Sequence, residues 1–458
     1  MSNEPQHGGR PSLLVRARAI LLTLYRRVIR HAAVLLGGNA VGSVFGLLTT
    51  IVITRALEPS GLGRIVLVQA YVQSIDGLVN FQSWRTLVRF GSGALERGDK
   101  QGLARVAAYA LRLDVISAIV ACGLGLALLW PASHLVEWDT PFILATGAYS
   151  VVYLFNLQGV PLAMFRMHKK FKILAAHKAG TAMFKLFLVC MCSLLGAEPI
   201  GFLIAWMVAD LINFSSLFVL GALEYRRGGY PWPHEVGVRG VSDEHPGILG
   251  YCLEVNAATA VRSLSKRLDL IIVGGALGEA ALGLYKTARQ AALVLGQLQD
   301  PLYQVLFPDL AADVAVGRRK AFVRNLLMTT SLSLCIAVGG WFGVYFLGEW
   351  GLGTLFGASY VPAYGVLVWY AGAICMGLAA LAVSPAVLAL GRSRWLLVSN
   401  IGATIAYFLL LSPLLSRYGL QGAGIAYFVF YIVWIGLMLW GTVSGYRRWQ
   451  PQMRHEDA

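Results

Sequence analysis

Two short stretches decide the fold of this chain: ALEPSGLG at residues 56–63 and ALGEAALG at residues 276–283. Each stretch joins two long apolar segments, and the copies lie 220 residues apart. A connector that recurs at the same place in two apolar regions indicates a structural unit that occurs twice in one chain.

The composition shows which solvent surrounds these apolar segments. Of the 458 residues, 57% are hydrophobic and only 13% are charged, whereas a soluble protein carries about a quarter charged residues. We therefore expect lipid as the solvent. The net charge of +15 lies in short clusters between apolar runs, which argues against a nucleic-acid partner. The six cysteines lie inside apolar runs without a CxxC pair, so we expect inert thiols.

Twelve apolar runs are long enough to cross a bilayer as helices of roughly 20 residues. They lie near 33–54, 62–84, 113–131, 141–164, 173–196, 199–222, 248–274, 279–306, 322–347, 361–389, 395–415 and 420–445. Each run is continuous and lacks the strict alternation of a membrane strand, which favours helices over a barrel. The sequence predicts an all-α polytopic membrane protein with about 12 transmembrane helices.

The distribution of lysine and arginine predicts the orientation. If the N-terminus is cytoplasmic, 28 of the 38 cations fall on the cytoplasmic side and only Arg55, Arg64 and Arg417 on the other. Cytoplasmic loops of membrane proteins carry an excess of these residues. We therefore expect both termini in the cytoplasm.

A second echo, GAEPIG at 196–201 and GLQGAG at 419–424, supports a repeat. With six helices in each half, both halves begin on the same side of the membrane. The repeats are therefore predicted to be parallel. The expected domains are a basic amphipathic cytoplasmic segment at 1–32, a six-helix bundle at 33–222, a cytoplasmic linker at 223–247, a second bundle at 248–445 and a cytoplasmic tail at 446–458.

Charged side chains within the predicted helices point to a polar interior. A charge at the centre of a bilayer costs at least about 2.5–3.5 kcal/mol, so it needs water, a partner or a ligand. We predict a cationic substrate-binding cavity lined by Gln69, Gln73, Lys185, Thr259, Arg262, Lys266, Lys286 and Arg289. Such a cavity suits a phosphate or diphosphate. The alternative is that pairs such as Arg262 with Asp269, or Arg289 with Asp300, only hold the bundle together.

Carboxylates at membrane depth are candidates for coupling transport to an ion or proton gradient. The candidates are Asp76, Asp210, Glu254, Asp269 and Asp300. Asp269 shares a helical face with Arg262 and Lys266, which would hold it ionised. The chain has no Walker A motif and no HExxH pattern, so we expect no ATP hydrolysis, no metal and no cofactor.

The stretches at 38–75 and 267–311 resemble the openings of the two halves of Wzx-type polysaccharide flippases. In the second stretch the shared pattern is Asp269, an apolar run, Leu282, Gly283, Tyr285 and Pro308. These flippases belong to the polysaccharide-transport family of the multidrug/oligosaccharidyl-lipid/polysaccharide exporter superfamily. The resemblance implies a V-shaped pair of six-helix bundles that works by alternating access, with ion coupling.

The resemblance also implies a cargo and a location. The cargo would be an oligosaccharide on undecaprenyl diphosphate, such as an O-antigen or exopolysaccharide repeat unit, moved to the periplasmic leaflet of the bacterial inner membrane. Membrane lipids, a polysaccharide polymerase and chain-length proteins would be its partners, and no covalent bond would change. Two alternatives stay open: a drug or cation antiporter of the same fold, and a membrane enzyme of polysaccharide assembly. The basic residues at 248–306 argue against the antiporter.

Overall fold

The computed structural model describes residues 41–449 except 137, 234, 266, 298, 300–305, 307–309, 311 and 315. In this part of the chain every regular element is a helix, and nine helices are long and apolar enough to cross a membrane. A shorter apolar helix covers Val41–Ala56. The prediction of an all-α polytopic membrane protein is confirmed. The predicted segment at 1–32 and most of the tail at 446–458 lie outside the described residues.

The first part of the chain continues with α2 and four of the nine candidate membrane spans, with short elements between them. In order these are α2 (Pro59–Val79), α3 (Ser83–Glu96), α4 (Lys100–Ala127), α5 (Leu129–Val136), α6 (Thr140–Val152), η1 (Tyr153–Phe155), α7 (Gly159–Met167), α8 (Phe171–Leu194) and α9 (Pro199–Arg227). Helix starts follow local chemistry. The Asp99 carboxylate accepts the Gly102 N–H at 2.8 Å and so caps α4.

The second part is likewise built of long helices and short elements. Its elements are α10 (Val241–Glu244), α11 (Ile248–Ser265), α12 (Leu268–Gly296), α14 (Arg319–Gly351), η2 (Leu352–Phe356), η3 (Ala358–Ala363), α15 (Tyr364–Ala379), α16 (Val383–Ala389), α17 (Ser393–Tyr418) and α18 (Leu420–Arg448). The helix predicted over 248–274 is broken at Arg267, and α12 kinks at Gly278, whose φ of 83° is readily adopted only by glycine.

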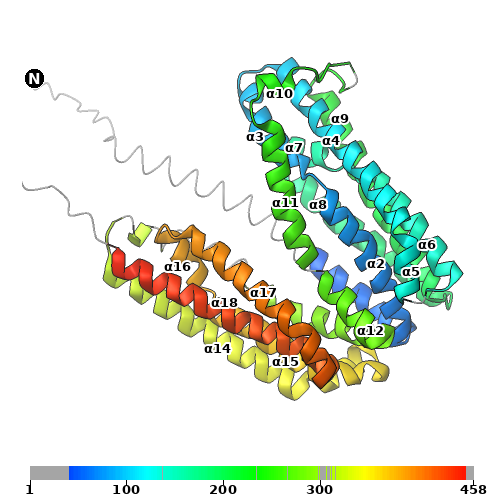
Figure 1. Cartoon of the computed structure of the whole chain (residues 1–458), viewed down its shortest axis with the longest axis vertical. Coiled ribbons are helices and arrows are strands. Elements are labelled where there is room, and N and C mark those ends of the chain that lie inside the picture. Colours follow the sequence, from blue (N-terminus) through cyan, green and yellow to red (C-terminus); the bar gives the residue numbers. More distant parts are fainter. Residues whose placement is uncertain are drawn as a thin grey trace, which may run out of the picture.

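The helices form two lobes that diverge from one joint (Figure 1). The first lobe contains α3–α9, and the second lobe contains α14–α18. At the joint, α2 packs along α12 through a core that includes the fully buried Ile65, Val68, Val273 and Leu282. This is the V-shaped arrangement implied by the resemblance.

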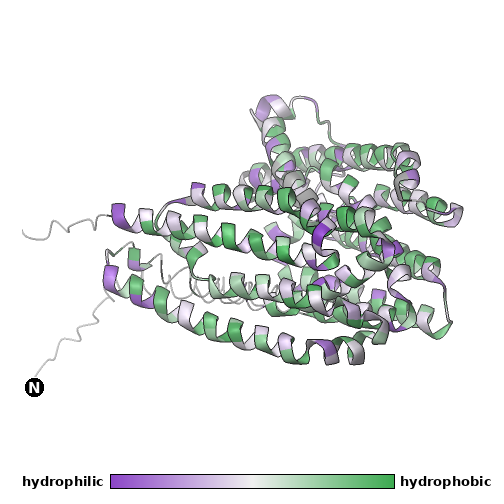
Figure 2. Ribbon diagram, turned by 60° about the horizontal axis from the view of Figure 1, so that its bottom comes forward, coloured by the Kyte–Doolittle hydropathy of each residue, from purple (hydrophilic) through white to green (hydrophobic). Residues whose placement is uncertain are grey.

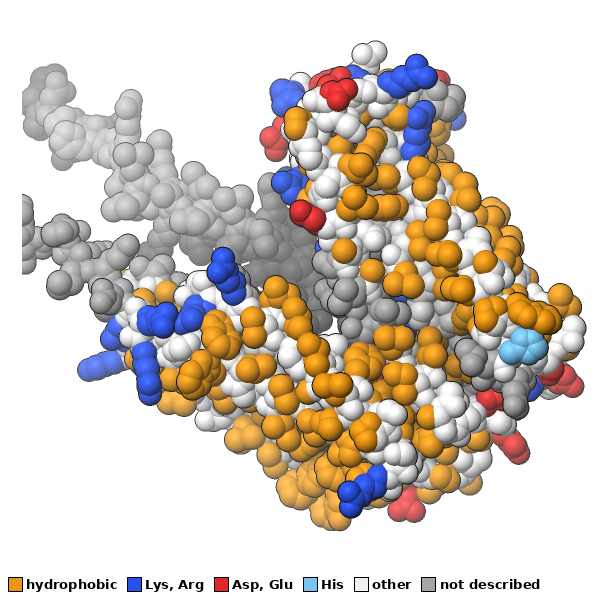
Figure 3. All heavy atoms as spheres, in the orientation of Figure 1, with side chains coloured by type: hydrophobic (Ala, Val, Ile, Leu, Met, Phe, Trp, Pro, Cys, Tyr) orange, Lys and Arg blue, Asp and Glu red, His pale blue; other side chains and the backbone are white. Residues whose placement is uncertain are grey.

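The surface has the polarity of a membrane protein. Figure 2 shows long hydrophobic stretches along the helices and hydrophilic residues mainly toward their ends. Phe346 and Trp440 are 72% and 67% exposed, which is favourable only if lipid covers them. In Figure 3, apolar side chains cover the visible sides of both lobes, and many Lys and Arg side chains lie at the lobe ends far from the joint.

Candidate functional site

Three interrupted helices meet around one polar cavity in the first lobe. The chain breaks between α2 and α3, between α6 and α7, and between α11 and α12. The cavity has a volume of about 380 Å³ and is lined mainly by polar side chains, among them Gln73, Asp76, Asn80, Asp114, Asn156, Asp210 and Arg267. Non-helical backbone at membrane depth is tolerated where it lines a wet cavity, and such breaks mark binding sites in transporters.

Carboxylates and amides form the wall of this cavity. Asn156 donates to Asp76 Oδ1 at 3.0 Å, and Asn80 donates to the same oxygen at 3.5 Å. The buried Asp114 accepts the backbone N–H of Gly159 at 3.1 Å. Tyr149 donates its hydroxyl to Asp210. The wall therefore offers oxygen and amide groups to a polar or cationic guest.

Arg267 is the one cation among the described residues that line the cavity. It comes from the break between α11 and α12, donates to the backbone carbonyl of Gln73 and lies within electrostatic range of Asp76. Sequence reasoning missed Arg267 because an unbroken helix would turn it away from the polar face. It also missed Asn156, an amide in an apolar run. The polarity of this side chain was the only available signal.

One part of the cavity wall is held in a strained conformation. Gln82, which precedes α3, has a φ of 48°, in the left-handed region that few non-glycine residues adopt. Its N–H donates to Asn80 Oδ1 at 3.0 Å, and its side-chain oxygen accepts the indole N–H of Trp84 at 3.1 Å. Strain of this kind persists where surrounding contacts fix a functional conformation.

A second group of polar residues lies between α8 and α12. Lys286 is within electrostatic range of Lys185 and Arg289, with Asp269 as the opposing charge. The Lys185 ammonium lies 4.3 Å from the centroid of the Trp206 ring. Among the described residues neither lysine has a carboxylate oxygen within the 4.0 Å of an ion pair. Two lysines predicted to bind substrate, from distant parts of the chain, thus lie within electrostatic range of each other.

Arg289 has a different environment from the two lysines. Its Nη1 lies 2.6 Å from Asp269 Oδ2, and the two side chains are only 18% and 6% exposed. Tyr285 donates its hydroxyl to the same carboxylate oxygen at 2.9 Å. Asp269 thus contacts Arg289 and Tyr285 across the kink at Gly278. Its contact with Arg289 is a buried ion pair of the kind expected to hold a bundle together.

The remaining predicted residues are spread over the structure. Gln73, Asp76 and Asp210 line the polar cavity, and Gln69 lies beside Tyr149. Thr259 is half-buried in α11, and Glu254 is exposed on the same helix. Arg262 belongs to α11, but its side chain lies outside the description, as do Lys266 and Asp300 altogether.

The second lobe has a hollow of another character. A groove of about 450 Å³ runs between α14, α15 and α18 and is lined by apolar residues such as Leu334, Phe342, Trp369 and Phe428. Among the described residues no charged side chain lines it, so it suits hydrocarbon chains.

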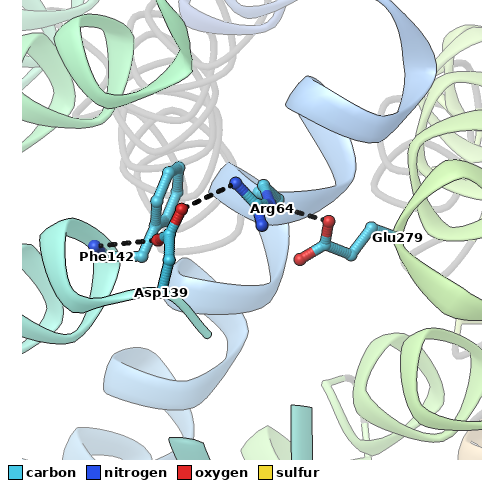
Figure 4. Close-up of polar contacts among 4 residues, drawn as sticks. All are labelled: Arg64, Asp139, Phe142 and Glu279. Atoms are coloured by element: carbon cyan, nitrogen blue, oxygen red, sulfur yellow. Dashed lines mark hydrogen bonds and ion pairs between the residues drawn. The ribbon is translucent and has the colours of Figure 1, made fainter. Parts of the chain in front are cut away.

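Ion pairs and hydrogen bonds close the joint between the lobes. Arg64 at the start of α2 bonds Glu279 Oε2 at 2.8 Å and Asp139 Oδ2 at 3.2 Å (Figure 4). Arg55 donates to the carbonyls of Thr354 and Leu355, and the Tyr360 hydroxyl donates to the Leu57 carbonyl at 3.1 Å. Each contact joins residues that are far apart in the chain, so the lobes are sealed together at this end.

Comparisons with known proteins agree with this architecture. A family model described as "Polysaccharide biosynthesis protein" matches residues 109–364. The inner membrane protein YghQ of Escherichia coli K12 is 25% identical over 75% of this chain and 96% of its own length.

Solved structures of low sequence identity share the fold. An inward-facing multidrug resistance MATE family transporter of the MOP superfamily superposes with a TM-score of 0.68 at 14% identity, covering 88% of this chain and 94% of its own. The lipid II flippase MurJ in an inward closed conformation gives 0.64 at 11% identity, with coverage of 90% and 88%.

Proposed function

The chain belongs to the polysaccharide biosynthesis protein family, and from this premise we propose that it is a flippase for lipid-linked oligosaccharide. The cargo would be an oligosaccharide repeat unit of an O-antigen or exopolysaccharide on undecaprenyl diphosphate. It would cross from the cytoplasmic to the periplasmic leaflet of the inner membrane, a location supported by the inner membrane relative from Escherichia coli. In this proposal the protein is a transporter and changes no covalent bond.

The observation that carries the proposal is that Lys185 and Lys286 interact electrostatically, although neither forms an ion pair with a described carboxylate. They come from α8 and α12 and lie within electrostatic range of each other at membrane depth. Two like charges in a medium of low dielectric constant repel strongly unless an anion lies between them. A diphosphate is an anion of suitable charge, and both ammonium groups can donate to its oxygens.

The arrangement of the lobes supports the direction of loading. The contacts of Arg55 and Arg64 seal the joint, and the lobes diverge from it toward the ends that carry α10 and α16 (Figure 1). The charge distribution predicts that these ends face the cytoplasm. The conformation is thus one that would receive cargo from the cytoplasmic leaflet, and the opposite state would require the joint to open.

Reconstitution into liposomes tests the proposal. Lys185→Gln and Lys286→Gln remove the charge and shorten the side chain by one atom, and Lys172→Gln on the exposed face of α8 is the matched control. With fluorescent undecaprenyl diphosphate in one leaflet, we expect leaflet exchange by the wild type and by the control. Because each lysine donates a charge-assisted hydrogen bond, we expect exchange to be about ten-fold slower in each lysine variant. Equal rates in all four proteins would refute the role of these lysines.

The polar cavity favours a second candidate, a drug or cation antiporter of the same fold. Asp76, Asp114 and Asp210 line it, against the single described cation Arg267, and an excess of carboxylates suits a cationic guest. In the same liposomes this function predicts efflux of ethidium that depends on Asp76. Ethidium efflux without exchange of the fluorescent lipid would replace the first proposal by the second.

A further inference from the structure

We propose that the mouth of the first-lobe cavity, formed by Arg85, Arg166 and Trp84, binds the diphosphate of the lipid-linked cargo before it reaches Lys185 and Lys286. This inference rests on the proposed function and adds a loading subsite to it. None of the three residues was a sequence-based candidate.

Arg85 and Arg166 both approach the ring of Trp84. The Arg166 guanidinium carbon lies 3.7 Å from the centroid of the Trp84 ring, and that of Arg85 lies 5.2 Å from it. The two guanidinium groups are close enough to repel each other. Trp84 lines the cavity, so both cations contact a residue of the cavity wall.

The two arginines lack carboxylate partners in the described part of the chain. Among the described residues, neither Arg85 nor Arg166 forms an ion pair with a carboxylate. The Nε of Arg85 is buried and has no hydrogen-bond acceptor there. A buried donor without an acceptor costs about 1–3 kcal/mol, and two adjacent unpaired cations add repulsion. A bound phosphate group would relieve both costs, because guanidinium groups match phosphate oxygens with paired donors.

Carboxylates in the cavity explain why the anion stays at the mouth. Asp76, Asp114 and Asp210 line the cavity behind Trp84 and would repel a diphosphate. Uncharged sugar hydroxyls, in contrast, can exchange hydrogen bonds with the amides and carboxylates there. The arrangement therefore separates the charged linkage at the rim from the sugars inside.

The Trp84 indole is held in place before a ligand binds, and tryptophan suits the depth of the lipid headgroups. The Trp84 indole is held by Gln82, which is held in turn by Asn80, so a ligand need not order it. The start of α3 at Ser83 adds the partial positive charge of a helix N-terminus. Tryptophan is enriched at the headgroup level of membranes, the depth at which a lipid-borne diphosphate arrives.

A phosphate group in this place has two sources, the diphosphate of the lipid-linked cargo or the headgroup of a bulk phospholipid. Binding to the full chain in phosphatidylcholine nanodiscs distinguishes them. Undecaprenyl diphosphate and phosphatidylglycerol are titrated separately, and bound lipid is counted by native mass spectrometry. We expect the wild type to prefer undecaprenyl diphosphate. Equal affinity for phosphatidylglycerol would overturn the proposal in favour of a general headgroup site.

Variants test whether undecaprenyl diphosphate binds at this mouth. R85Q/R166Q should bind undecaprenyl diphosphate about ten-fold more weakly, because two charge-assisted contacts are removed. R85K/R166K keeps the charges without the paired donors. Its affinity for undecaprenyl diphosphate should therefore lie between those of R85Q/R166Q and the wild type. Arg97→Gln, on the exposed end of the same helix, is the matched control. Thermal unfolding of each variant verifies that it is folded.

The outcomes separate this subsite from the proposed function. Wild-type binding by R85Q/R166Q, together with loss of binding in K185Q/K286Q, would overturn the subsite and leave the central lysines in place. Reduced binding in R85Q/R166Q with unchanged lipid exchange in K185Q/K286Q would support the mouth and refute the central site.

Discussion

Gly63 and Gly283 make reciprocal contacts across the joint between the two lobes. A Cβ atom added at Gly63 would lie 1.8 Å from the carbonyl oxygen of Glu279, and one added at Gly283 would lie 1.9 Å from that of Pro59. The two contacts are related by the same offset of 220 residues that separates ALEPSGLG from ALGEAALG. The sequence echo is therefore a pair of equivalent close approaches.

These approaches explain why glycine occurs at both positions. Small residues let membrane helices come close enough for their backbones to touch. In each contact a hydrogen on the glycine α-carbon points at a carbonyl oxygen of the other helix, a weak hydrogen bond that recurs at such interfaces. Any side chain would force α2 and α12 apart.

Gly63→Ala and Gly283→Ala should therefore destabilise the protein. Forcing an extra carbon into a packed contact costs about 1–3 kcal/mol, and we expect a lower midpoint of thermal unfolding in detergent for either variant. The matched control is Gly275→Ala, because a Cβ at that exposed position of α12 meets no atom within 4 Å. An equal loss of stability in all three variants would contradict the role of the joint.

Breaking the Arg64–Glu279 bond should shift the protein toward the state with the joint open. The two side chains are 31% and 24% exposed, so the pair contributes only about 0.5–1 kcal/mol. Arg64→Gln or Glu279→Gln should then raise the open population a few-fold, measured by the distance between spin labels at exposed positions on either side of the joint.

Two further variants control this experiment. Asp139→Asn should have a smaller effect, because Asp139 is 49% exposed and asparagine can still accept the Phe142 N–H at the start of α6. The charge reversal R64E/E279R should restore the closed population. If it does not, the ion pair does not hold the joint.

The Asp269–Arg289 pair should matter for stability. Removing one partner of a buried pair costs about 3–5 kcal/mol, whereas an apolar replacement of both can be neutral. We expect Asp269→Ala to unfold at a much lower temperature, and D269L/R289M to recover most of that loss. A stable Asp269→Ala variant with impaired lipid exchange would instead assign the pair to cargo binding.

We propose Asp76, which lines the polar cavity, as the carboxylate that couples transport to an ion gradient. Asp76→Asn keeps a side chain that can contact Asn156 and Asn80 but cannot release a proton or neutralise a cation. In liposomes we expect this variant to equilibrate lipid between leaflets yet fail to accumulate it under a proton or sodium gradient. Leu78→Ala, at an exposed position of the same helix, is the control. Accumulation by Asp76→Asn would exclude this carboxylate as the coupling group.

Part of the candidate site could be predicted from residue types alone. Lys185, Lys286, Gln73, Asp76 and Asp210 stand out because charges and amides are costly in apolar helices. Their grouping could not be predicted. Lys185 and Lys286 lie within electrostatic range of each other, whereas Gln73, Asp76 and Asp210 line a polar cavity that includes neither lysine.

The missed residues share one cause. Arg267, Gln82 and Asn156 owe their positions to breaks in helices that look continuous in the sequence. A single break changes the direction of every side chain after it, so a helical wheel drawn through 248–274 misplaces both Arg267 and Asp269.

The sequence by itself determined that this chain is a helical membrane protein with an internal repeat, because hydrophobicity and length act locally and add up along the chain. Tertiary structure alone decided which embedded charges neutralise one another and which stay without a partner. That outcome depends on helix kinks and on the rotation of each helix against its neighbours. Arg289 meets Asp269 across the kink at Gly278, whereas no described carboxylate pairs with Lys286, although the two cations are three residues apart.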